Sequence, residues 1–286
     1  MELTQQIRDK AKELLESEKV ESVIGYERAT DGVTARPKLA YHAEEIDKLI
    51  FDRTCTHNLT RYLINKRDKA TAIVVKPCDS RAINLLLIEK QIKREKVLII
   101  GVVCSGVVEA KWNQPGETLQ PCCQICRQHT PVIYDFLIGD PPVEQPPPDP
   151  FADVAEIEGK SINERQSFWA EHFNRCLRCY ACRQACPGCY CQECFVEQLD
   201  PLWAGIRIAP SENQMWHVIR AFHLAGRCID CNECQRVCPV NIPLSLLNRK
   251  LGQEVLELFD FQAGLSAEAL PPFATFEKDE KVGIGE

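Results

Sequence analysis

The sequence has no excess of positive charge, no long apolar run and no apolar segment near its start. A formal net charge of -7 and a sequence pI near 5.5 leave no broad basic surface for the phosphates of nucleic acid. The most apolar short run, residues 97–103, falls well short of the roughly 20 residues that cross a bilayer. The first residues are charged and amphipathic and lack the regions of a secretory signal. We expect a cytoplasmic protein without a membrane span or nucleic-acid partner. Docking of the protein to a membrane-bound complex is still compatible with these features.

Motifs of common catalytic sites are also missing. No G-x-G-x-x-G fingerprint follows a predicted strand, which leaves a dinucleotide-binding Rossmann site without support. The six histidines show neither an H-E-x-x-H motif nor paired ligand spacing, so a histidine-based metal site is not indicated. Arg127 and His129 are still of interest, because they follow Cys126 closely. Their charge and hydrogen bonds are suited to tuning the reduction potential of a metal centre at that cysteine.

Cysteine, by contrast, is abundant, with 17 residues in the chain. The number is odd, and structural disulfides are rare in a reducing compartment. Metal binding is therefore the first explanation for so many thiols.

The first 140 residues predict an α/β domain. Helical spacing of apolar residues predicts a helix over 1–17, and strands over 21–28 and 35–43 flank an Asp31-Gly32 turn. The next elements are helices over 44–51 and 56–65, a strand over 71–76, a helix over 81–92 and a strand over 97–103. The last three make one βαβ unit, which implies a parallel strand pair with a right-handed crossover.

A proline-rich stretch divides the chain. Residues 141–150 contain six prolines, which predicts a stiff linker over 141–160. A helix over 161–175 begins with a capping box of Ser161 and Glu164, and another over 212–225 ends at Gly226. Each helix leads into a cysteine run, so residues 161–187 and 211–239 are expected to be two approximate copies of one plan. They lie in a mainly helical domain expected over 161–255. Residues 256–286 are expected to be an acidic tail that wraps a partner or is mobile.

The two cysteine runs share one specific pattern, C-x-x-C-x-x-C-x-x-x-C-P. The first run contains Cys176, Cys179, Cys182 and Cys186, and the second contains Cys228, Cys231, Cys234 and Cys238. In two-cluster ferredoxins the fourth cysteine of each run binds the other 4Fe-4S cluster. The expected ligand sets are therefore Cys176, Cys179 and Cys182 with Cys238, and Cys228, Cys231 and Cys234 with Cys186. Zinc knuckles and disulfides are the alternatives, but zinc sites usually pair C-x-x-C knuckles that lie far apart.

Three further thiols, Cys189, Cys191 and Cys194, follow the first run and are not needed by these two clusters. We expect them to hold a further iron-sulfur centre together with a ligand from the N-terminal domain, with Cys55 as the candidate. The alternative is that they are buried thiols without a redox role.

The N-terminal domain carries its own cysteines at the ends of predicted strands. Cys78 follows the strand over 71–76, where a helix end, Lys76 and Arg81 are expected to favour its thiolate. Cys104 ends the next parallel strand, so both thiols should meet at one sheet edge. With Cys123 and Cys126 they can close a third cluster; Cys122 is the alternative to Cys123, and incidental packing thiols are the alternative to the site.

Two resemblances follow from these motifs. Residues 223–247 resemble α-helical dicluster ferredoxin modules of heterodisulfide-reductase-like and succinate-dehydrogenase-like subunits. KPCDSRAI, GVVCSG and CQICRQHTPVIYDFLIGD resemble the β-subunit family of deazaflavin-reducing hydrogenases and formate dehydrogenases. That likeness places the family's cluster ligands on Cys78, Cys104, Cys123 and Cys126. The chain departs from the family because its dicluster module comes second and little sequence remains for a flavin and deazaflavin pocket.

The combined interpretation is an iron-sulfur electron-transfer subunit of an anaerobic redox complex. The resemblances imply a flavoprotein, or the catalytic subunit of a formate dehydrogenase or hydrogenase, as partner, and a heterodisulfide-reductase-type complex is a further candidate. Molybdopterin, nickel and nucleotide motifs are missing, so we do not expect the chain itself to bind formate or hydrogen. Two alternatives remain. One is an FAD-containing oxidoreductase that acts on a deazaflavin or nicotinamide in its own N-terminal pocket. The other is a scaffold protein of an assembly, in which the cysteines bind structural zinc.

Overall fold

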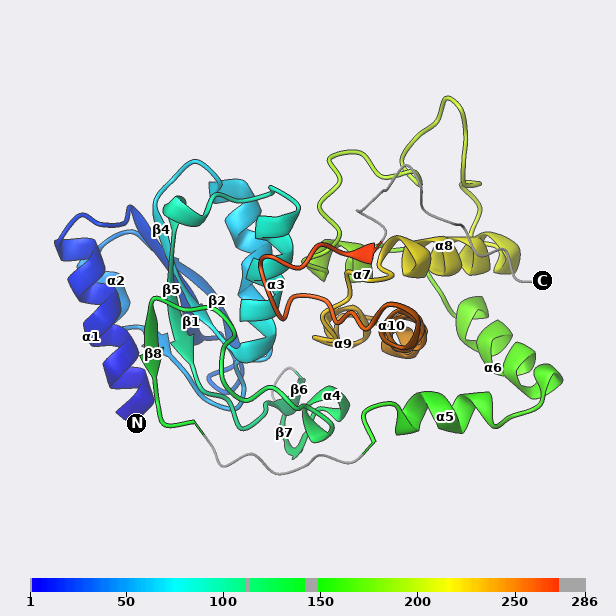
Figure 1. Cartoon of the computed structure of the whole chain (residues 1–286), viewed down its shortest axis with the longest axis horizontal. Helices are drawn as coiled ribbons and strands as arrows, with labels where there is room; N and C mark the ends of the chain where they lie inside the picture. The colour runs from blue at the N-terminus through cyan, green and yellow to red at the C-terminus, as the bar shows by residue number, and fades with distance from the viewer. Residues whose placement is uncertain (1, 112–113, 142–148, 273–286) are drawn as a thin grey trace.

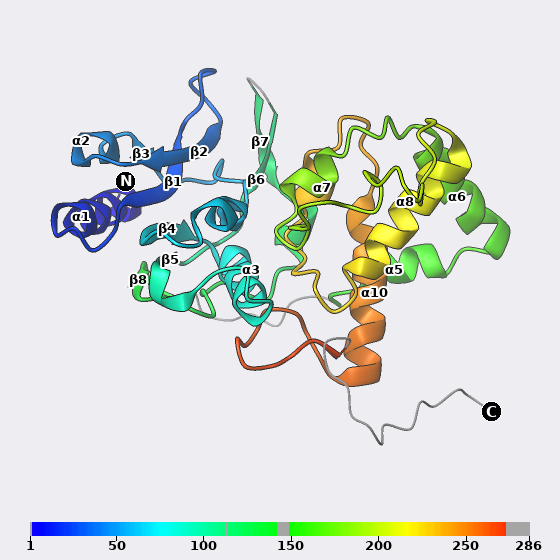
Figure 2. The ribbon, with the colours of Figure 1, turned by 90° about the horizontal axis from the view of Figure 1, so that it is seen from above.

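The first half of the chain forms a mixed β-sheet with helices on both faces (Figures 1 and 2). The computed structural model describes residues 2–111, 114–141 and 149–272. The strands of the sheet run in the order β2 (Ala35–Ala40), β1 (Ser22–Arg28), β4 (Thr71–Val75), β5 (Val97–Val102) and β8 (Phe136–Ile138), with β3 (Leu49–Ile50) paired to β1. Strands β1, β4, β5 and β8 are parallel, whereas β2 and β3 are antiparallel to β1. The α/β fold expected for this half is therefore present.

The predicted βαβ unit is confirmed. Strands β4 and β5 pair in parallel from Thr71 opposite Val97, and α3 (Pro77–Ile88) connects them. The helix begins four residues before the predicted start, because Pro77 occupies its first turn and Asp79 accepts a 3.0 Å hydrogen bond from the backbone N of Lys76.

Alternating residues of the strands build two hydrophobic cores. On one face, Ala72 and Val74 of β4 pack with Ile7 and Leu14 of α1 (Glu2–Glu16), the helix predicted over 1–17. On the other face, Ile73 and Val75 pack with the apolar residues of α3. Because neighbouring strand residues face opposite sides, one buried strand serves both cores.

Two predicted helices are wrong in part. The helix predicted over 44–51 is shorter and begins one residue earlier, as α2 (Ala43–Ile46). Leu49 and Ile50 form β3 instead, because they pair with Glu27 and Tyr26 in the sheet. The helix predicted over 56–65 is a 3-10 helix, η1 (Leu59–Lys66). A hairpin of β6 (Val108–Lys111) and β7 (Gln114–Leu119) and the short α4 (Pro121–Gln124) were not predicted.

The second half is helical. Its elements are α5 (Ala152–Glu158), α6 (Ile162–Asn174), α7 (Ala181–Ala185), α8 (Pro210–His223), α9 (Glu233–Arg236) and α10 (Leu244–Phe259). The predicted capping box of α6 is present: Ser161 Oγ accepts from Glu164 N, and Glu164 Oε2 accepts from Ser161 N at 2.9 Å. Helix α5 lies within the predicted linker, of which residues 142–148 are outside the described residues.

The end of the described chain returns to the N-terminal domain. Helix α10 continues to Phe259, beyond the predicted boundary at 255. Farther on, Arg81 of α3 donates to Ala263 O at 2.8 and 3.0 Å, and Asn84 donates to Gly264 O at 2.9 Å. Gly264 has φ +77°, and a Cβ there would lie 2.3 Å from Arg81 O, so only glycine fits this contact. Residues 273–286 of the predicted tail lie outside the described residues.

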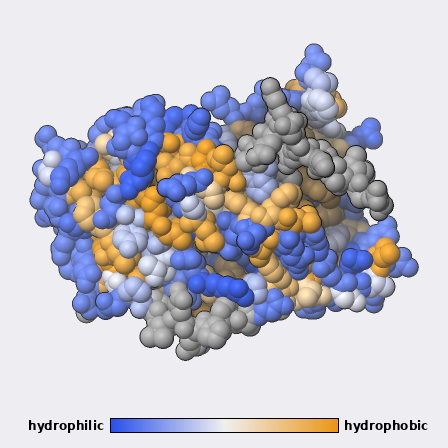
Figure 3. Space-filling model, viewed as in Figure 1, coloured by the Kyte–Doolittle hydropathy of each residue, from blue (hydrophilic) through white to orange (hydrophobic). Residues whose placement is uncertain are grey.

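On the face shown in Figure 3, apolar residues lie mainly over the middle of the molecule. None of the helices in the described ranges has the length and apolar character needed to cross a bilayer.

Candidate functional site

The two cysteine runs share the same backbone conformation. In the first run Arg178 and Tyr180 have φ values of 50° and 57°, and in the second Asp230 and Asn232 both have 60°. These four residues occupy equivalent places, directly before and after the middle cysteine of each C-x-x-C-x-x-C stretch. The short helices α7 and α9 also occupy equivalent places. The internal repeat predicted from the sequence is therefore a repeat of structure.

Site A is the cavity lined by Cys176, Cys179, Cys182 and Cys238. Three thiols come from the first run and one from the second, which is one of the two predicted sets. Trp216 and His217 of α8 also line it. Burial raises the pKa of the Cys182 thiol to about 11, so without a bound cation this sulfur is protonated at neutral pH.

Site B is the cavity lined by Cys186, Cys228, Cys231 and Cys234, the other predicted set. Burial raises the pKa of Cys234 to about 12. A hydrogen bond from the Cys189 thiol instead lowers the pKa of Cys186 to about 6. Each site thus collects four thiols from two distant parts of the chain, as two-cluster ferredoxin motifs require.

Arg220 of α8 lies where the two sites meet. Its side chain is buried, with 4% of the residue exposed, and its Nη2 donates to Cys182 O at 3.1 Å. Its Nε has no hydrogen-bond partner, and no ion pair to a carboxylate is found for it among the described residues. Burial opposes the charge of the guanidinium, but the neighbouring Cys186 and Cys234 sulfurs raise its pKa above the ordinary value. The groups that face this buried cation are therefore cysteine sulfurs and a backbone carbonyl, not a carboxylate.

Site N is the cavity lined by Cys78, Cys104, Cys123 and Cys126, with Cys122 beside them. Cys78 lies in the first turn of α3 after β4, and Cys104 follows β5, so both stand at the carboxyl edge of the parallel strands as predicted. Cys123 belongs to α4, and Cys126 follows it. The sheet edge and one loop therefore bring the four predicted thiols together.

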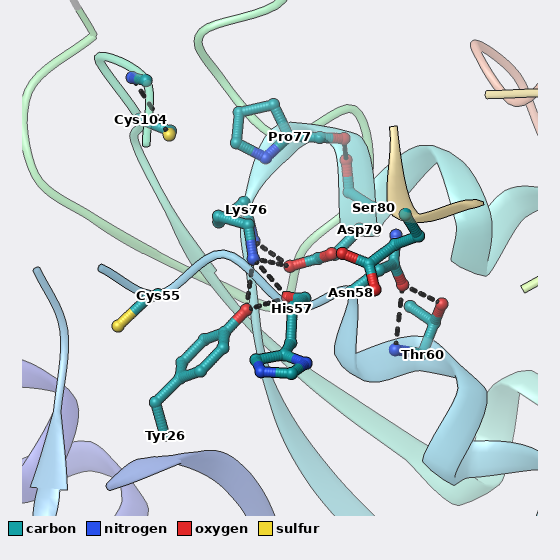
Figure 4. Close-up of polar contacts among 12 residues, drawn as sticks. Tyr26, Cys55, His57, Asn58, Thr60, Lys76, Pro77, Asp79, Ser80 and Cys104 are labelled. Atoms are coloured by element: carbon teal, nitrogen blue, oxygen red, sulfur yellow. Dashed lines mark hydrogen bonds and ion pairs between the residues drawn. The ribbon is translucent and has the colours of Figure 1, made fainter. Parts of the chain in front are cut away.

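A buried network of polar contacts around Lys76 lies beside site N (Figure 4). Lys76 donates to His57 O at 2.7 Å and to the hydroxyl of Tyr26, and its Nζ lies 3.0 Å from Asp79 Oδ2. Burial opposes the charge of Lys76, but Asp79 and Tyr26 raise its pKa well above the ordinary value, so the lysine is charged. Lys76 is two residues before Cys78 in the sequence, and its charge interacts with the Cys78 thiol in the structure.

The predicted effect of this environment on Cys78 is wrong in direction. Burial and the Asp79 carboxylate raise the pKa of the Cys78 thiol well above its ordinary value, and they outweigh Lys76. Arg81, also expected to favour the thiolate, is hydrogen-bonded to Ala263 O. In this site the thiolate therefore needs a bound cation.

Cys122 and Cys123 differ within site N. Their sulfurs are 4.0 Å apart, and a hydrogen bond from Cys122 lowers the pKa of Cys123 to about 6. The Cys123 sulfur also accepts a hydrogen bond from Val107 N at 3.5 Å. This backbone donor favours negative charge on the Cys123 sulfur. His129, the predicted tuning residue, has Nδ1 2.9 Å from Cys104 O.

Site N adjoins site B. Asp230 and Cys231 of the second run line the cavity of site N. A larger cavity is lined by Cys78 and Cys126 of site N together with Cys228 of site B. The three sites therefore follow one another in the order N, B, A.

The remaining predicted thiols are divided between two places. Cys189, Cys191 and Cys194 line a cavity of their own, the three-thiol cavity, together with His223 and three arginines. Cys55 is not among the residues that line it. Cys55 is fully buried in the core next to α3, where its sulfur accepts a hydrogen bond from Asp52 N at 3.3 Å. This placement gives the predicted ligand role of Cys55 no geometric support.

Thiol chemistry fits iron-sulfur clusters at sites A, B and N. Four cysteine sulfurs line each cavity, and each cubane takes four cysteine ligands, one per iron. Across the described ranges, no three His, Cys, Asp or Glu side chains converge tightly enough to chelate a single metal ion. A cubane spreads its ligands over four irons, so its thiolates do not meet at one point.

Sequence reasoning missed Arg220 and underestimated Lys76. Arg220 follows the helical period of α8 and has no motif of its own, so only tertiary structure places it between the sites. Lys76 directly precedes Pro77-Cys78, which is the signal that marks it in the sequence.

The fold and the cysteine sets define a class of protein: an α/β domain joined to a helical, cysteine-rich half with thiol-lined cavities along their junction. No family model matches the chain. It is similar to the F420-dependent formate dehydrogenase subunit beta of Methanocaldococcus jannaschii, with 22% identity over 93% of both chains. It is also similar to the F420-dependent formate dehydrogenase 1 subunit beta of Methanococcus maripaludis, with 21% identity over 91% of this chain and 90% of the relative. The resemblance to β-subunits predicted from the sequence is confirmed.

Proposed function

We propose that the chain is an iron-sulfur electron-transfer subunit of a formate dehydrogenase-type complex. It relays electrons through three 4Fe-4S clusters, at sites N, B and A, between a flavin-containing or catalytic partner and an acceptor subunit. The observation that carries the proposal is the spatial order of the three four-thiol cavities. The relatives support the type of complex, since both are named as formate dehydrogenase β subunits.

The order of the cavities suits a relay. Site N lies in the α/β domain, site B adjoins it through Asp230 and Cys231, and site A adjoins site B around Arg220. When bound, each cluster supplies one-electron redox chemistry. The chain holds the clusters in sequence and supplies the cations that offset their charge.

The protein environment has a defined task at each site. Lys76 places a buried positive charge beside site N, and Arg220 does so between sites A and B. Buried positive charge stabilises the more negative, reduced form of a cluster and raises its reduction potential. Burial limits the access of water to the thiols of sites A and B: three are buried, four are half-buried and Cys179 is exposed.

The test is anaerobic purification of the chain with its complex, followed by iron and sulfide analysis and EPR spectroscopy. We expect about twelve irons or more per chain, since each cubane holds four, and EPR signals of reduced clusters after the complex receives formate. About eight irons or fewer, or clusters that formate does not reduce in the intact complex, would overturn the three-cluster relay, since eight irons fill only two cubanes. A colourless protein with zinc in place of iron would favour a zinc-stapled scaffold.

A second candidate is an FAD-containing oxidoreductase that acts on a deazaflavin or nicotinamide. It is favoured by the larger cavity beside sites N and B, where Arg81, Arg127 and Arg249 join Cys78 and Cys228. Arginines there can bind the phosphates of a nucleotide. Flavin released from the purified chain, with turnover in the absence of partners, would support this candidate.

A further inference from the structure

We infer that Cys189, Cys191, Cys194 and His223 form a fourth iron-sulfur site, in which the imidazole supplies the ligand that a fourth cysteine would otherwise provide. The inference rests on the proposed function, because it extends the relay by one centre. Its starting observation is the three-thiol cavity, which these three cysteines and His223 line together.

The cavity assembles its ligands from two segments. Cys189, Cys191 and Cys194 lie in the turn that follows α7, and His223 is the last residue of α8. The His223 ring stands edge-on to Phe195, with centroids 5.5 Å apart, which holds the imidazole beside the residue that follows Cys194. Three thiols and one imidazole make four ligands, and histidine replaces cysteine on iron in Rieske centres.

The turn is held in place by arginines on both sides. Arg227 donates to Gly188 O at 3.1 Å and to His223 O at 2.8 Å, so it joins the start of the turn to the end of α8. Arg183 donates to Cys191 O at 3.4 Å and forms an ion pair with Glu197, whose other oxygen accepts from Cys194 N at 2.9 Å. The ligand turn is therefore built by tertiary contacts as well as by its own sequence.

The charges around the cavity fit an anionic group. Arg183, Arg220 and Arg227 line it, and each interacts electrostatically with Cys189. Glu197 and Glu89 neutralise two of them. Arg220 is the third, and its buried Nε has no hydrogen-bond partner among the described residues. Arg220 therefore stands between site B and the three-thiol cavity, and its buried positive charge favours an anionic group in either.

The site would extend the relay next to site B. The Cys189 sulfur lies within hydrogen-bond distance of the side chain of Cys186, a predicted ligand of site B. Cys191 is exposed, so the centre would stand where electrons can pass to or from a partner at the surface.

The experiment compares metal content and EPR spectra of the anaerobic full-length protein and its variants. We expect Cys191→Ser/Cys194→Ser to hold about four irons fewer than the wild type and to lose one EPR component. We expect His223→Ala to lose iron and change the same component, and His223→Cys to keep the iron with a lower midpoint potential, since imidazole ligation raises the potential. His172→Ala, a change of a histidine on α6 that lines none of these cavities, is the matched control.

Unchanged iron and spectra in the double cysteine variant would overturn the fourth site, as would zinc in place of the extra iron. Unchanged iron and spectra in His223→Ala would overturn the role of His223. These results are distinct from failure of the relay itself, in which the wild type would hold fewer than about eight irons and Cys228→Ser would remove none.

Discussion

Arg227 and Glu89 form a bidentate ion pair between the two halves of the chain. Arg227 Nε lies 2.5 Å from Glu89 Oε1, and its Nη2 lies 2.8 Å from Oε2. Glu89 follows the last residue of α3, whereas Arg227 directly precedes Cys228 of site B. Tyr190 joins the pair, since its hydroxyl accepts from Arg227 at 2.7 Å and donates to Glu89. One cluster of side chains thus links the α/β domain, site B and the three-thiol cavity.

Removal of the carboxylate should weaken this junction. We expect Glu89→Ala to lower the free energy of unfolding by about 1.5–3 kcal/mol, the usual contribution of hydrogen bonds to charged groups. Anaerobic chemical denaturation measures this change. Asp68→Asn, which breaks the exposed pair of Asp68 with Lys93, is the control and should cost much less, because solvent screens an exposed ion pair. Equal losses in the two variants would contradict the importance of the Glu89 pair.

Removal of the cation between sites A and B should lower two reduction potentials. In Arg220→Gln we expect the midpoint potentials of both centres to fall, because the reduced clusters lose a buried positive charge. Arg220→Lys should restore much of the effect. The measurement is a redox titration followed by EPR. Unchanged potentials in Arg220→Gln, with full iron content, would show that Arg220 has only a packing role.

The two adjacent thiols of site N should respond differently to substitution. Cys123→Ser is expected to lose about four irons per chain, because Cys123 is the predicted ligand. Cys122→Ser should retain them, since serine keeps a hydroxyl that can donate to the Cys123 sulfur. Iron analysis of both variants separates the residues. The opposite pattern would assign the ligand to Cys122.

The left-handed backbone of the second run should favour glycine over alanine. Asn232 has φ 60°, and its Oδ1 has no hydrogen-bond partner in the described part of the chain. Asn232→Ala is expected to lower stability by about 1 kcal/mol, because alanine keeps the strained Cβ but lacks the short polar side chain that lets asparagine tolerate this region. Asn232→Gly should cost less. The denaturation midpoint, followed through visible absorption, compares them, and a more stable alanine variant would refute the strain argument.

Local patterns were enough to predict the parts of the fold that depend on sequence periodicity. The βαβ unit follows from two short apolar strands with a helix between them, and it is present from Thr71 to Val102. The thiol sets of sites A and B follow from cysteine spacing alone. Elements that depend on distant pairing were not predictable. Leu49 and Ile50 fit a helical period but form a strand, because Tyr26 and Glu27 offer them a sheet edge.

The effect of neighbouring charges on the cysteine pKa values could be determined only from the structure. The sequence places Lys76 and Arg81 near Cys78, but it does not reveal that burial outweighs both charges. Cys55 has no local feature that separates a ligand from a core thiol, and its burial in the core becomes visible only in three dimensions. His223 lies five residues before Cys228, the first cysteine of the second run. Its position at the three-thiol cavity depends on how α8 packs, which the sequence does not reveal.

The contact of Arg81 and Asn84 with residues 263 and 264 imposes an order on biosynthesis. Helix α3 carries Cys78 and leaves the ribosome long before these two carbonyl groups. Until they arrive, the buried Arg81 side chain lacks its acceptors. The first domain to be translated is therefore completed by one of the last segments, after every cysteine of the chain has been made, so that cluster insertion and closure of the fold can be coupled.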